Sequence, residues 1–479
     1  MSGRLNFEYG FNTNSAQPLE NNTPMRVYFL SDFTAVNAVS ENTFTNKILK
    51  IDIDNFDDVM IKLSPSVSLP SGHQIIFNED FHPDSLFEND IFKNIRRLKR
   101  ELGNSATAES AAEEIMLTYQ LDSETKPETL NDDSIAASLD RKTIDENTEG
   151  NDDMFERLLG QKQSTSTGPE QVTVSTQTAG SLDRFLGDLL SNHIIKDAKP
   201  EHASLMVFID SAIEELMRSI LHSEEFQALE SAWRSVRDVI FNEEYDEANQ
   251  FFYLVNMDKE ALNSAVAGDT HFVSTLSQHI KNTDVECYDV LIGNYQFSGS
   301  DEGITTLNYL ASIAETLQCQ LVSSAANSLI NADTDSLWQQ FKQTPQASHV
   351  ALSYPSVLLR IPYGKKHDEV DVLAFEEFSQ AHQHNKLLWG NSAFACARLL
   401  IRQYHNQDNG QGALDTTITE LPAFVYVQDD ENKLQACGEF LLSEQELINI
   451  QKQGIMAFAS YRNKNCIRLF GSGIRAVNT

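Results

Sequence analysis

The residues with the clearest capacity for metal chemistry form an acidic run near the N-terminus, Asp52-Ile53-Asp54-Asn55-Phe56-Asp57-Asp58. Closely spaced carboxylates are typical ligands of calcium in a helix–loop–helix site. A loop of that kind beginning at Asp52 would need glycine at position 57 and glutamate at position 63, where the sequence has aspartate and leucine. We therefore interpret the run as the end of a strand followed by a short helix that Asn55 caps.

A second candidate metal site is the pair His382-x-His384, to which His367 and His405 could add further ligands. Neither a pair of closely spaced cysteines nor the His-Glu-x-x-His spacing of a zinc helix accompanies it. A polar loop is therefore the favoured interpretation, and we predict no metal site.

Three glycines, Gly293, Gly299 and Gly303, lie close together but lack the spacing of a phosphate-binding loop. They indicate strand ends and turns. No Gly-x-Ser-x-Gly motif is present, and none of the five cysteines lies in a nucleophile signature. We predict no catalytic residue and no cofactor. The alternative is an enzyme whose reactive side chains converge from distant segments.

The 479-residue chain is strongly acidic, with a formal net charge of -34 and a pI near 4.6. Such a surface repels nucleic acid phosphates and anionic lipid head groups. We therefore expect partners other than nucleic acid and no direct insertion into a membrane.

Five scattered cysteines without a Cys-x-x-Cys pair indicate a reduced, intracellular protein. The first thirty residues lack a cationic start followed by an apolar core, and no stretch approaches the length of a membrane span. These features predict a cytoplasmic location.

The N-terminal region reads as a flexible arm, residues 1–23, followed by a small α/β module, residues 24–102. Residues 25–30 are continuously apolar, which indicates a buried strand, and residues 49–54 alternate as a half-buried strand does. A helix limited by Pro65 should follow Asn55, and residues 84–102 have the pattern of one helix with basic residues in its last turns.

Residues 103–180 are rich in Glu, Asp, Ser and Thr and poor in aromatics. They predict an acidic, partly disordered linker with helical propensity at 106–120 and 152–159. From residue 181 to 479, amphipathic helices alternate with apolar strands. The strands are expected at 251–255, 290–292, 357–361, 423–427 and 455–459. The fold class is therefore α/β, with a mixed sheet flanked by helices.

The second half resembles the large sheath subunit of type VI secretion, the TssC/VipB family. Four segments carry the resemblance in the same order as in the family: Phe226–Arg234, Leu291–Phe297, Tyr354–Gly364 and Leu388–Ala393. The residues that this singles out as family-motif or interface residues are Phe226, Leu229, Trp233, Arg234, Tyr295, Arg360, Pro362, Tyr363, Trp389 and Asn391. The helical spacing around Trp233 favours a core position and a subunit interface equally.

The first hundred residues resemble the small sheath subunit, the TssB/VipA family. The matching segments are Met25–Thr34, Ile51–Met60, Pro65–Val67 and Phe81–Asp84, and they add Asp54 and Phe56 to the candidate residues. One chain thus joins a small-subunit-like module to a large-subunit-like domain. Relative to the family, the chain lacks the usual C-terminal extension of the large subunit, and the small module continues into an acidic linker.

The resemblance implies a structural component of a bacterial contractile sheath that acts by subunit packing and strand exchange. Other sheath subunits are the expected partners. Baseplate proteins, inner-tube proteins and an AAA+ unfoldase that would grip the region 182–195 are further partners that the family implies. The alternative within the same machine is a subunit close to the baseplate, or a terminating one, that does not propagate the tube.

Overall fold

A computed structural model of the chain describes residues 23–34, 48–69, 72–119, 202–257, 262, 266, 271–281, 287–333, 336–378, 383–408, 416–428, 431–461 and 464–471. The predicted arm before residue 23, the predicted linker beyond residue 119, the region 182–195 and His382 lie outside these residues.

One large sheet organises the molecule. Its nine strands lie in the order β11-β15-β14-β8-β7-β6-β1-β5-β2. The parallel strands are β5 (Gln250–Asn256), β1 (Met25–Ser31), β6 (Tyr288–Phe297), β7 (Gln320–Ala325), β8 (Val350–Tyr354) and β14 (Met456–Ser460). Antiparallel strands form the edges: β2 (Ile48–Ile51) on one side, and β15 (Ile467–Phe470) with β11 (Thr417–Ile418) on the other.

The strand nearest the N-terminus occupies the middle of this sheet. In β1, Met25 lies opposite Gln250 on β5 and opposite Tyr288 on β6. Every residue of β1 is buried, and its side chains alternate between the two faces: Val27 and Phe29 join one hydrophobic cluster, and Tyr28 and Leu30 the other. A strand covered on both faces has a continuously apolar sequence, and so the predicted buried strand at 25–30 is confirmed.

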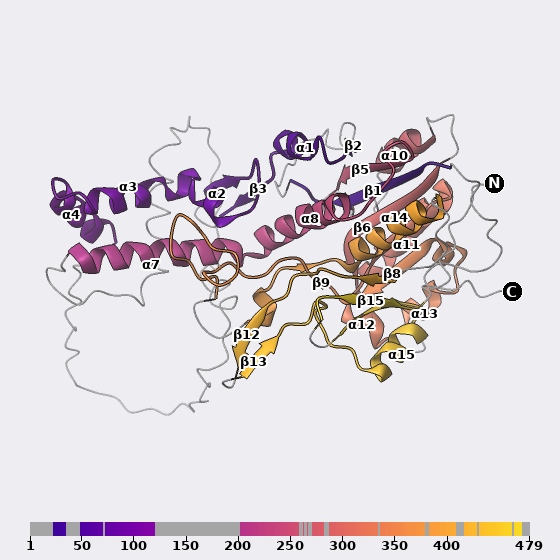
Figure 1. Cartoon of the computed structure of the whole chain (residues 1–479). Helices are drawn as coiled ribbons and strands as arrows, with labels where there is room; N and C mark the ends of the chain where they lie inside the picture. Colours follow the sequence, from indigo (N-terminus) through magenta and orange to yellow (C-terminus); the bar gives the residue numbers. More distant parts are fainter. Residues whose placement is uncertain are drawn as a thin grey trace, which may run out of the picture.

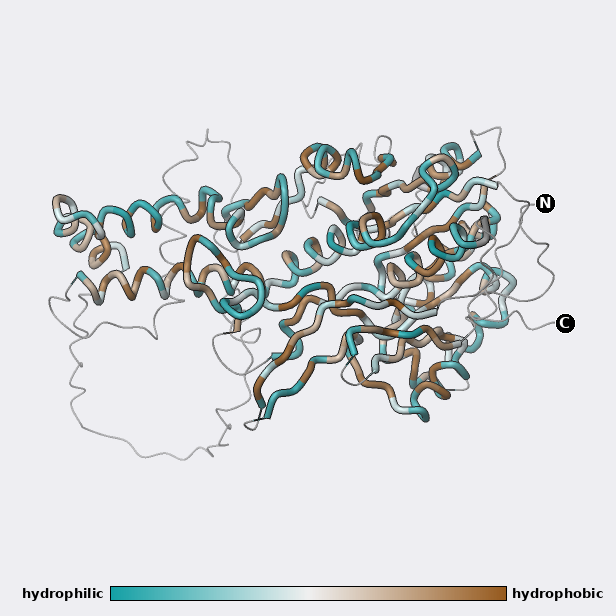
Figure 2. The backbone as a smooth tube through the Cα atoms, in the orientation of Figure 1, coloured by the Kyte–Doolittle hydropathy of each residue, from teal (hydrophilic) through white to brown (hydrophobic). Residues whose placement is uncertain are grey.

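Helices cover both faces of the sheet (Figure 1). On one face lie α8 (Glu224–Phe241) and α14 (Ser392–Asp408). The other face carries α10 (His271–Lys281), α11 (Asp301–Leu317), α12 (Asn327–Ile330), α13 (Leu337–Phe341) and α15 (Glu444–Lys452). As predicted, Ser223 caps α8, with its hydroxyl accepting from the N–H of Phe226. The tube coloured by hydropathy is mostly brown along the central strands and mostly teal along α3, which extends away from the sheet (Figure 2).

A helical extension continues from one end of the molecule, where α3 (Lys93–Leu102) and α4 (Ala108–Thr118) lie beside α7 (His202–Leu221) (Figure 1). The single helix predicted over 84–102 is wrong, because α2 (Pro83–Phe87) and α3 are separated by a short 3₁₀ turn, Asp90–Phe92. Phe87 and Phe92 are both buried with their ring centroids 5.5 Å apart. In one continuous helix, residues five apart would lie about 140° apart around the axis, so the break lets both rings face the same core.

The small module also contains α1 (Phe56–Leu63), β3 (Ser66–Ser68) and β4 (Gln74–Ile76). Asp57 and Asp58 occupy the first turn of α1, as predicted. The predicted side-chain cap by Asn55 is wrong. Its amide oxygen instead accepts from the N–H of Asp52, and its amide nitrogen donates to the carbonyl of Lys50, because the turn before α1 brings these groups nearer.

Of the other predicted strands, 251–255, 290–292 and 455–459 are confirmed as β5, β6 and β14. The stretch 357–361 is shorter than predicted: only β9 (Val357–Leu358) pairs, with β10 (Trp389–Gly390). The stretch 423–427 contributes β12 (Val425–Gln428), which forms a hairpin with β13 (Glu431–Leu434) outside the main sheet. Two further 3₁₀ turns are Pro345–His349 and His384–Lys386.

Candidate functional site

The acidic run and the histidines do not form a metal site in the described part of the chain. No group of three His, Cys, Asp or Glu side chains gathers there as metal ligands would. Asp54 is exposed, and Asp52 uses one carboxylate oxygen to accept from the N–H of Asn55.

Among the described helices, none combines the length and the apolar character needed to cross a bilayer.

The strand order β5-β1-β6-β7-β8-β14 is that of a doubly wound sheet with its switch point between β1 and β6, where such folds commonly bind ligands. Here the polar groups at the carboxyl ends bond to one another. Asn256 accepts from the N–H of Phe33 at 2.7 Å, and Asn294 donates to the hydroxyl of Ser31 at 3.0 Å. Asn391 donates to the carbonyl of Tyr295 at 3.0 Å. The polar side chains at this position are therefore engaged in hydrogen bonds within the chain.

Most of the predicted motif residues are buried inside the chain itself. Fully buried are Phe56, Phe226, Leu229, Trp233, Arg360, Pro362 and Tyr363; partly buried are Arg234, Tyr295, Trp389 and Asn391; Asp54 is exposed. The structure brings six of them together in two places, an ionic cluster of Arg360, Arg234 and Tyr363 and an aromatic cluster of Trp233, Phe56 and Phe226, whereas Asp54, Tyr295, Trp389 and Asn391 lie outside both.

The ionic cluster joins α8 to the segment that follows β9. The Arg360 Nε atom donates to Glu230 Oε1 at 2.8 Å, and its Nη1 atom donates to Glu377 Oε2 at 2.7 Å. Arg234, one helical turn after Glu230, donates to Glu230 Oε1 at 2.7 Å and to the hydroxyl of Tyr363 at 2.7 Å. The positive charges of two guanidinium groups thus compensate the negative charges of Glu230 and Glu377, whose carboxylates are almost completely buried.

The electrostatics of the cluster follow from this pairing. Burial opposes the ionisation of Glu377, but Arg360 and the contact with His222 outweigh it and lower the pKa of Glu377 to about 2. Burial alone would lower the pKa of Arg360, yet Glu230 and Glu377 hold it above its ordinary value. Burial raises the pKa of the Tyr363 phenol. Glu377, Arg360 and Tyr363 therefore each keep one protonation state at neutral pH, which suits a fixed structural joint better than proton transfer.

The pKa of Glu377 predicts a dependence of stability on acid. Because the folded-state pKa lies below the ordinary value of 4.5, the stabilisation is complete above pH 4.5 and is lost as the pH falls toward 2. Its size is about 3 kcal/mol. In denaturant unfolding followed from pH 7 to pH 3, the Glu377→Gln variant should be less stable than the parent at pH 7, and the gap should narrow below pH 4.5. A gap that stays constant over this range would contradict the assignment.

The segment held by Glu377 also reaches the small module. Glu377 Oε2 accepts from the N–H of Tyr363 at 2.8 Å, which closes the loop between these residues. The loop then meets α2, where the Asp84 carboxylate accepts from the N–H groups of Asp371 and Val372 at 3.3 and 3.1 Å. The His82 ring packs edge-on against Tyr363 with centroids 5.0 Å apart. The ionic cluster therefore positions the loop between Tyr363 and Glu377, which contacts His82 and Asp84, residues far away in the sequence.

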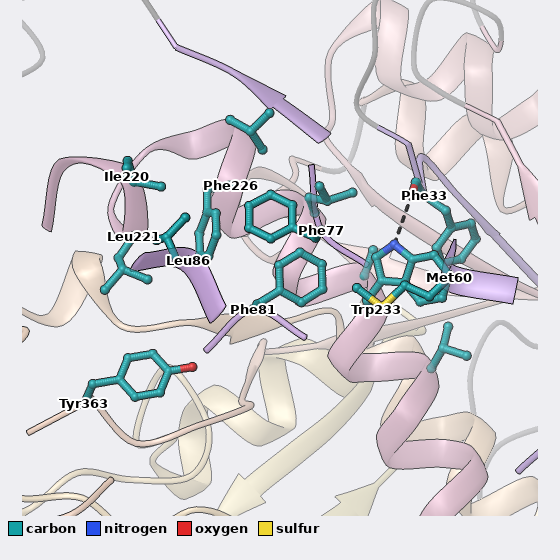
Figure 3. Packing of buried hydrophobic residues seen from close by; sticks show 14 of the residues in the cluster. Phe33, Met60, Phe77, Phe81, Leu86, Ile220, Leu221, Phe226, Trp233 and Tyr363 are labelled. Atoms are coloured by element: carbon teal, nitrogen blue, oxygen red, sulfur yellow. Dashed lines mark hydrogen bonds between the residues drawn. The ribbon is translucent and has the colours of Figure 1, made fainter. Parts of the chain in front are cut away.

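The aromatic cluster joins α8 to the small module (Figure 3). The Trp233 indole nitrogen donates to the carbonyl of Phe33 at 3.0 Å, and its ring makes edge contacts with Phe33 and Phe56. In the first turn of α8, Phe226 packs edge-on against Phe77 and Phe81 of the small module, which extends the contact between the two parts. The predicted motif helix is thus the surface on which the N-terminal residues pack.

Residues that sequence reasoning did not single out complete the ionic cluster and its loop. Glu230 lies inside the recognised helix segment and four residues before Arg234, a spacing at which opposite charges pair, so a signal for it existed. Glu377 had no comparable signal, and Asp84, although it ends the matched segment Phe81–Asp84, had no signal for its partner. Their partners are distant in sequence: Arg360 is 17 residues from Glu377, and Val372 is 288 residues from Asp84.

Comparison with known proteins gives the following matches. The family model for VipB (EvpB/VC_A0108, tail sheath N-terminal domain) matches residues 203–336 and 334–474. The family model for type VI secretion system VipA (VC_A0107 or Hcp2) matches residues 2–128. The chain is 25% identical over 352 residues to the type VI secretion system sheath protein TssC1 of Pseudomonas aeruginosa. The aligned residues cover 66% of this chain and 70% of the relative.

Proposed function

The chain belongs to the VipB family of type VI secretion sheath proteins and carries a VipA-type segment at its N-terminus, and we propose that it acts by subunit packing and strand exchange without catalysing a reaction. The observation that supports this most directly is the place of β1. This strand belongs to the VipA-matching residues, and it lies between β5 and β6 of the VipB-matching residues. The partners are other sheath subunits, in the bacterial cytoplasm.

We propose further that the fusion replaces a separate small subunit within the same chain. One hydrophobic cluster draws on both matching regions, from Met25 to Leu469. Residues 120–201 connect them in the sequence, and a covalent connection gives each part an effective local concentration for the other, on the order of millimolar for a flexible linker. Docking in one chain would therefore compete well with docking between chains.

Strand exchange needs strands with unpaired edges, and the described residues contain them. β2 pairs only with β5, and the hairpin β12–β13 pairs with no third strand. On the hairpin, Val425 and Val427 are 45% and 65% exposed, although β-branched apolar residues usually pack. These edges are our candidates for pairing with neighbouring subunits. Baseplate proteins, inner-tube proteins and an AAA+ unfoldase are further proposed partners.

The fusion is tested by cutting the connection. A site for a specific protease inserted after Gly168 should be cleavable without separating the two parts, because β1 is hydrogen-bonded on both sides. Size-exclusion chromatography after cleavage should give one peak containing both fragments. Two separate peaks at neutral pH would overturn docking within one chain.

Polymerisation is tested by electron microscopy of the purified chain, alone and with sheath subunits of the same system. Tubes that incorporate this chain along their length are expected. The Val425→Lys/Val427→Lys variant should shorten or abolish them, whereas Gln428→Lys, the exposed neighbour on the same strand, should not. Labelling only at tube ends would favour a terminating subunit, and failure to join any sheath partner would overturn the proposed function.

A further inference from the structure

A small cavity of about 30 Å³ lies where α8 and α14 meet the segment 357–359 and the edge strands β11 and β15. Its walls are mostly apolar, with Val357, Phe394 and Ile418 among them. Four polar residues also line it: Ser235 and Asp238 from α8, Arg398 from α14, and Asn391 just before α14. The cavity thus lies between α8 and two of the segments that carry the family resemblance, Tyr354–Gly364 and Leu388–Ala393.

Ser235 is the unusual member of this lining. It is 1% exposed, and its hydroxyl has no hydrogen-bond partner among the residues that the structure describes. Helical serines commonly bond to a backbone carbonyl, as Ser219 does to Leu216 within α7 and as Ser231 of α8 does to Trp389 of β10. A buried hydroxyl without a partner is costly, so a group that bonds to it is needed.

The size of the cavity decides which group this can be. A water molecule needs roughly 10–15 Å³ of cavity volume, so 30 Å³ accommodates one or two waters and is too small for an inserted side chain such as leucine. The polar lining suits water as well. Arg398 uses its Nε and Nη1 atoms on Glu243 and Asp238, and a guanidinium carries five N–H groups. The Asn391 amide oxygen accepts from Ala393 and has a second lone pair.

We propose that this cavity holds an ordered water that accepts from or donates to the Ser235 hydroxyl and bonds to the polar groups of α14 or its preceding residue. The water is then a structural part of the joint between α8 and α14. This inference is independent of the proposed function, because it concerns the fold of the single chain.

The sign of a stability change tests the proposal. If the hydroxyl bonds to water, Ser235→Ala removes one of the water's partners and should lower the thermal midpoint by about 1–2 °C. Ser231→Ala is the matched control on the same helix, since its hydroxyl has a protein partner, and it should also lower the midpoint. A Ser235→Ala midpoint equal to or above that of the parent would overturn the proposal, because it would show that the hydroxyl had no partner to lose.

A high-resolution experimental structure gives a second, direct readout. Density for a water at about 2.6–3.2 Å from the Ser235 Oγ atom is expected. Side chains that close the cavity, with the hydroxyl bonded to a protein atom, would overturn the proposal whatever the thermal result.

Discussion

Replacement of Arg360 by alanine should lower the free energy of unfolding by about 3–5 kcal/mol. The reason is that Arg360 bonds to both Glu230 and Glu377, whose side chains are 0% and 1% exposed. Without the guanidinium, two buried carboxylates would lose their main compensating charge and repel each other. The measurement is denaturant unfolding of the full chain at pH 7, followed by tryptophan fluorescence and circular dichroism.

Two further variants make this test specific. Arg234→Ala should cost only about 1 kcal/mol, because the Arg234 side chain is 30% exposed and Glu230 keeps its bonds to Arg360. The triple variant Arg360→Met/Glu230→Gln/Glu377→Gln should recover part of the loss, since it removes the unpaired charges together. If Arg360→Ala were no more harmful than Arg234→Ala, the cluster would not be the ionic joint described above.

Replacement of Trp233 by alanine should also destabilise the chain by about 3–5 kcal/mol, through the cavity that it leaves. Trp233 is 1% exposed, and it contacts Phe33 and Phe56 of the VipA-matching region. The loss should therefore fall most heavily on the packing of α1. Hydrogen exchange measured by mass spectrometry should show faster exchange in residues 56–63 of the variant.

Trp338→Ala is the matched control for this prediction. Trp338 is 0% exposed and packs in the hydrophobic cluster on the opposite face of the sheet. Its replacement should reduce global stability by a comparable amount, without a selective increase in exchange over residues 56–63. Equal exchange of α1 in both variants would show that Trp233 is an ordinary core residue with no special part in holding the N-terminal region.

Much of the fold followed from local patterns. The continuous apolar run at 25–30 predicted a buried strand, and the serine followed by two glutamates at 223–225 predicted the start of α8. The resemblance to the large sheath subunit singled out segments whose residues Arg360, Tyr363, Phe226 and Trp233 are buried and take part in the two clusters. Where prediction was wrong, as with the interrupted helix at 84–102, packing of Phe87 and Phe92 overrode a regular helical pattern.

The sequence by itself determined that β1 would be a strand covered on both faces, because side-chain polarity reports burial. It also determined the class of machine, because long motif segments keep their order. Only the tertiary structure decided that β1 would lie between β5 and β6, because strands pair through backbone groups that are the same in every residue. It likewise decided that Glu377 would compensate Arg360, since that contact depends on a loop whose path no local pattern specifies.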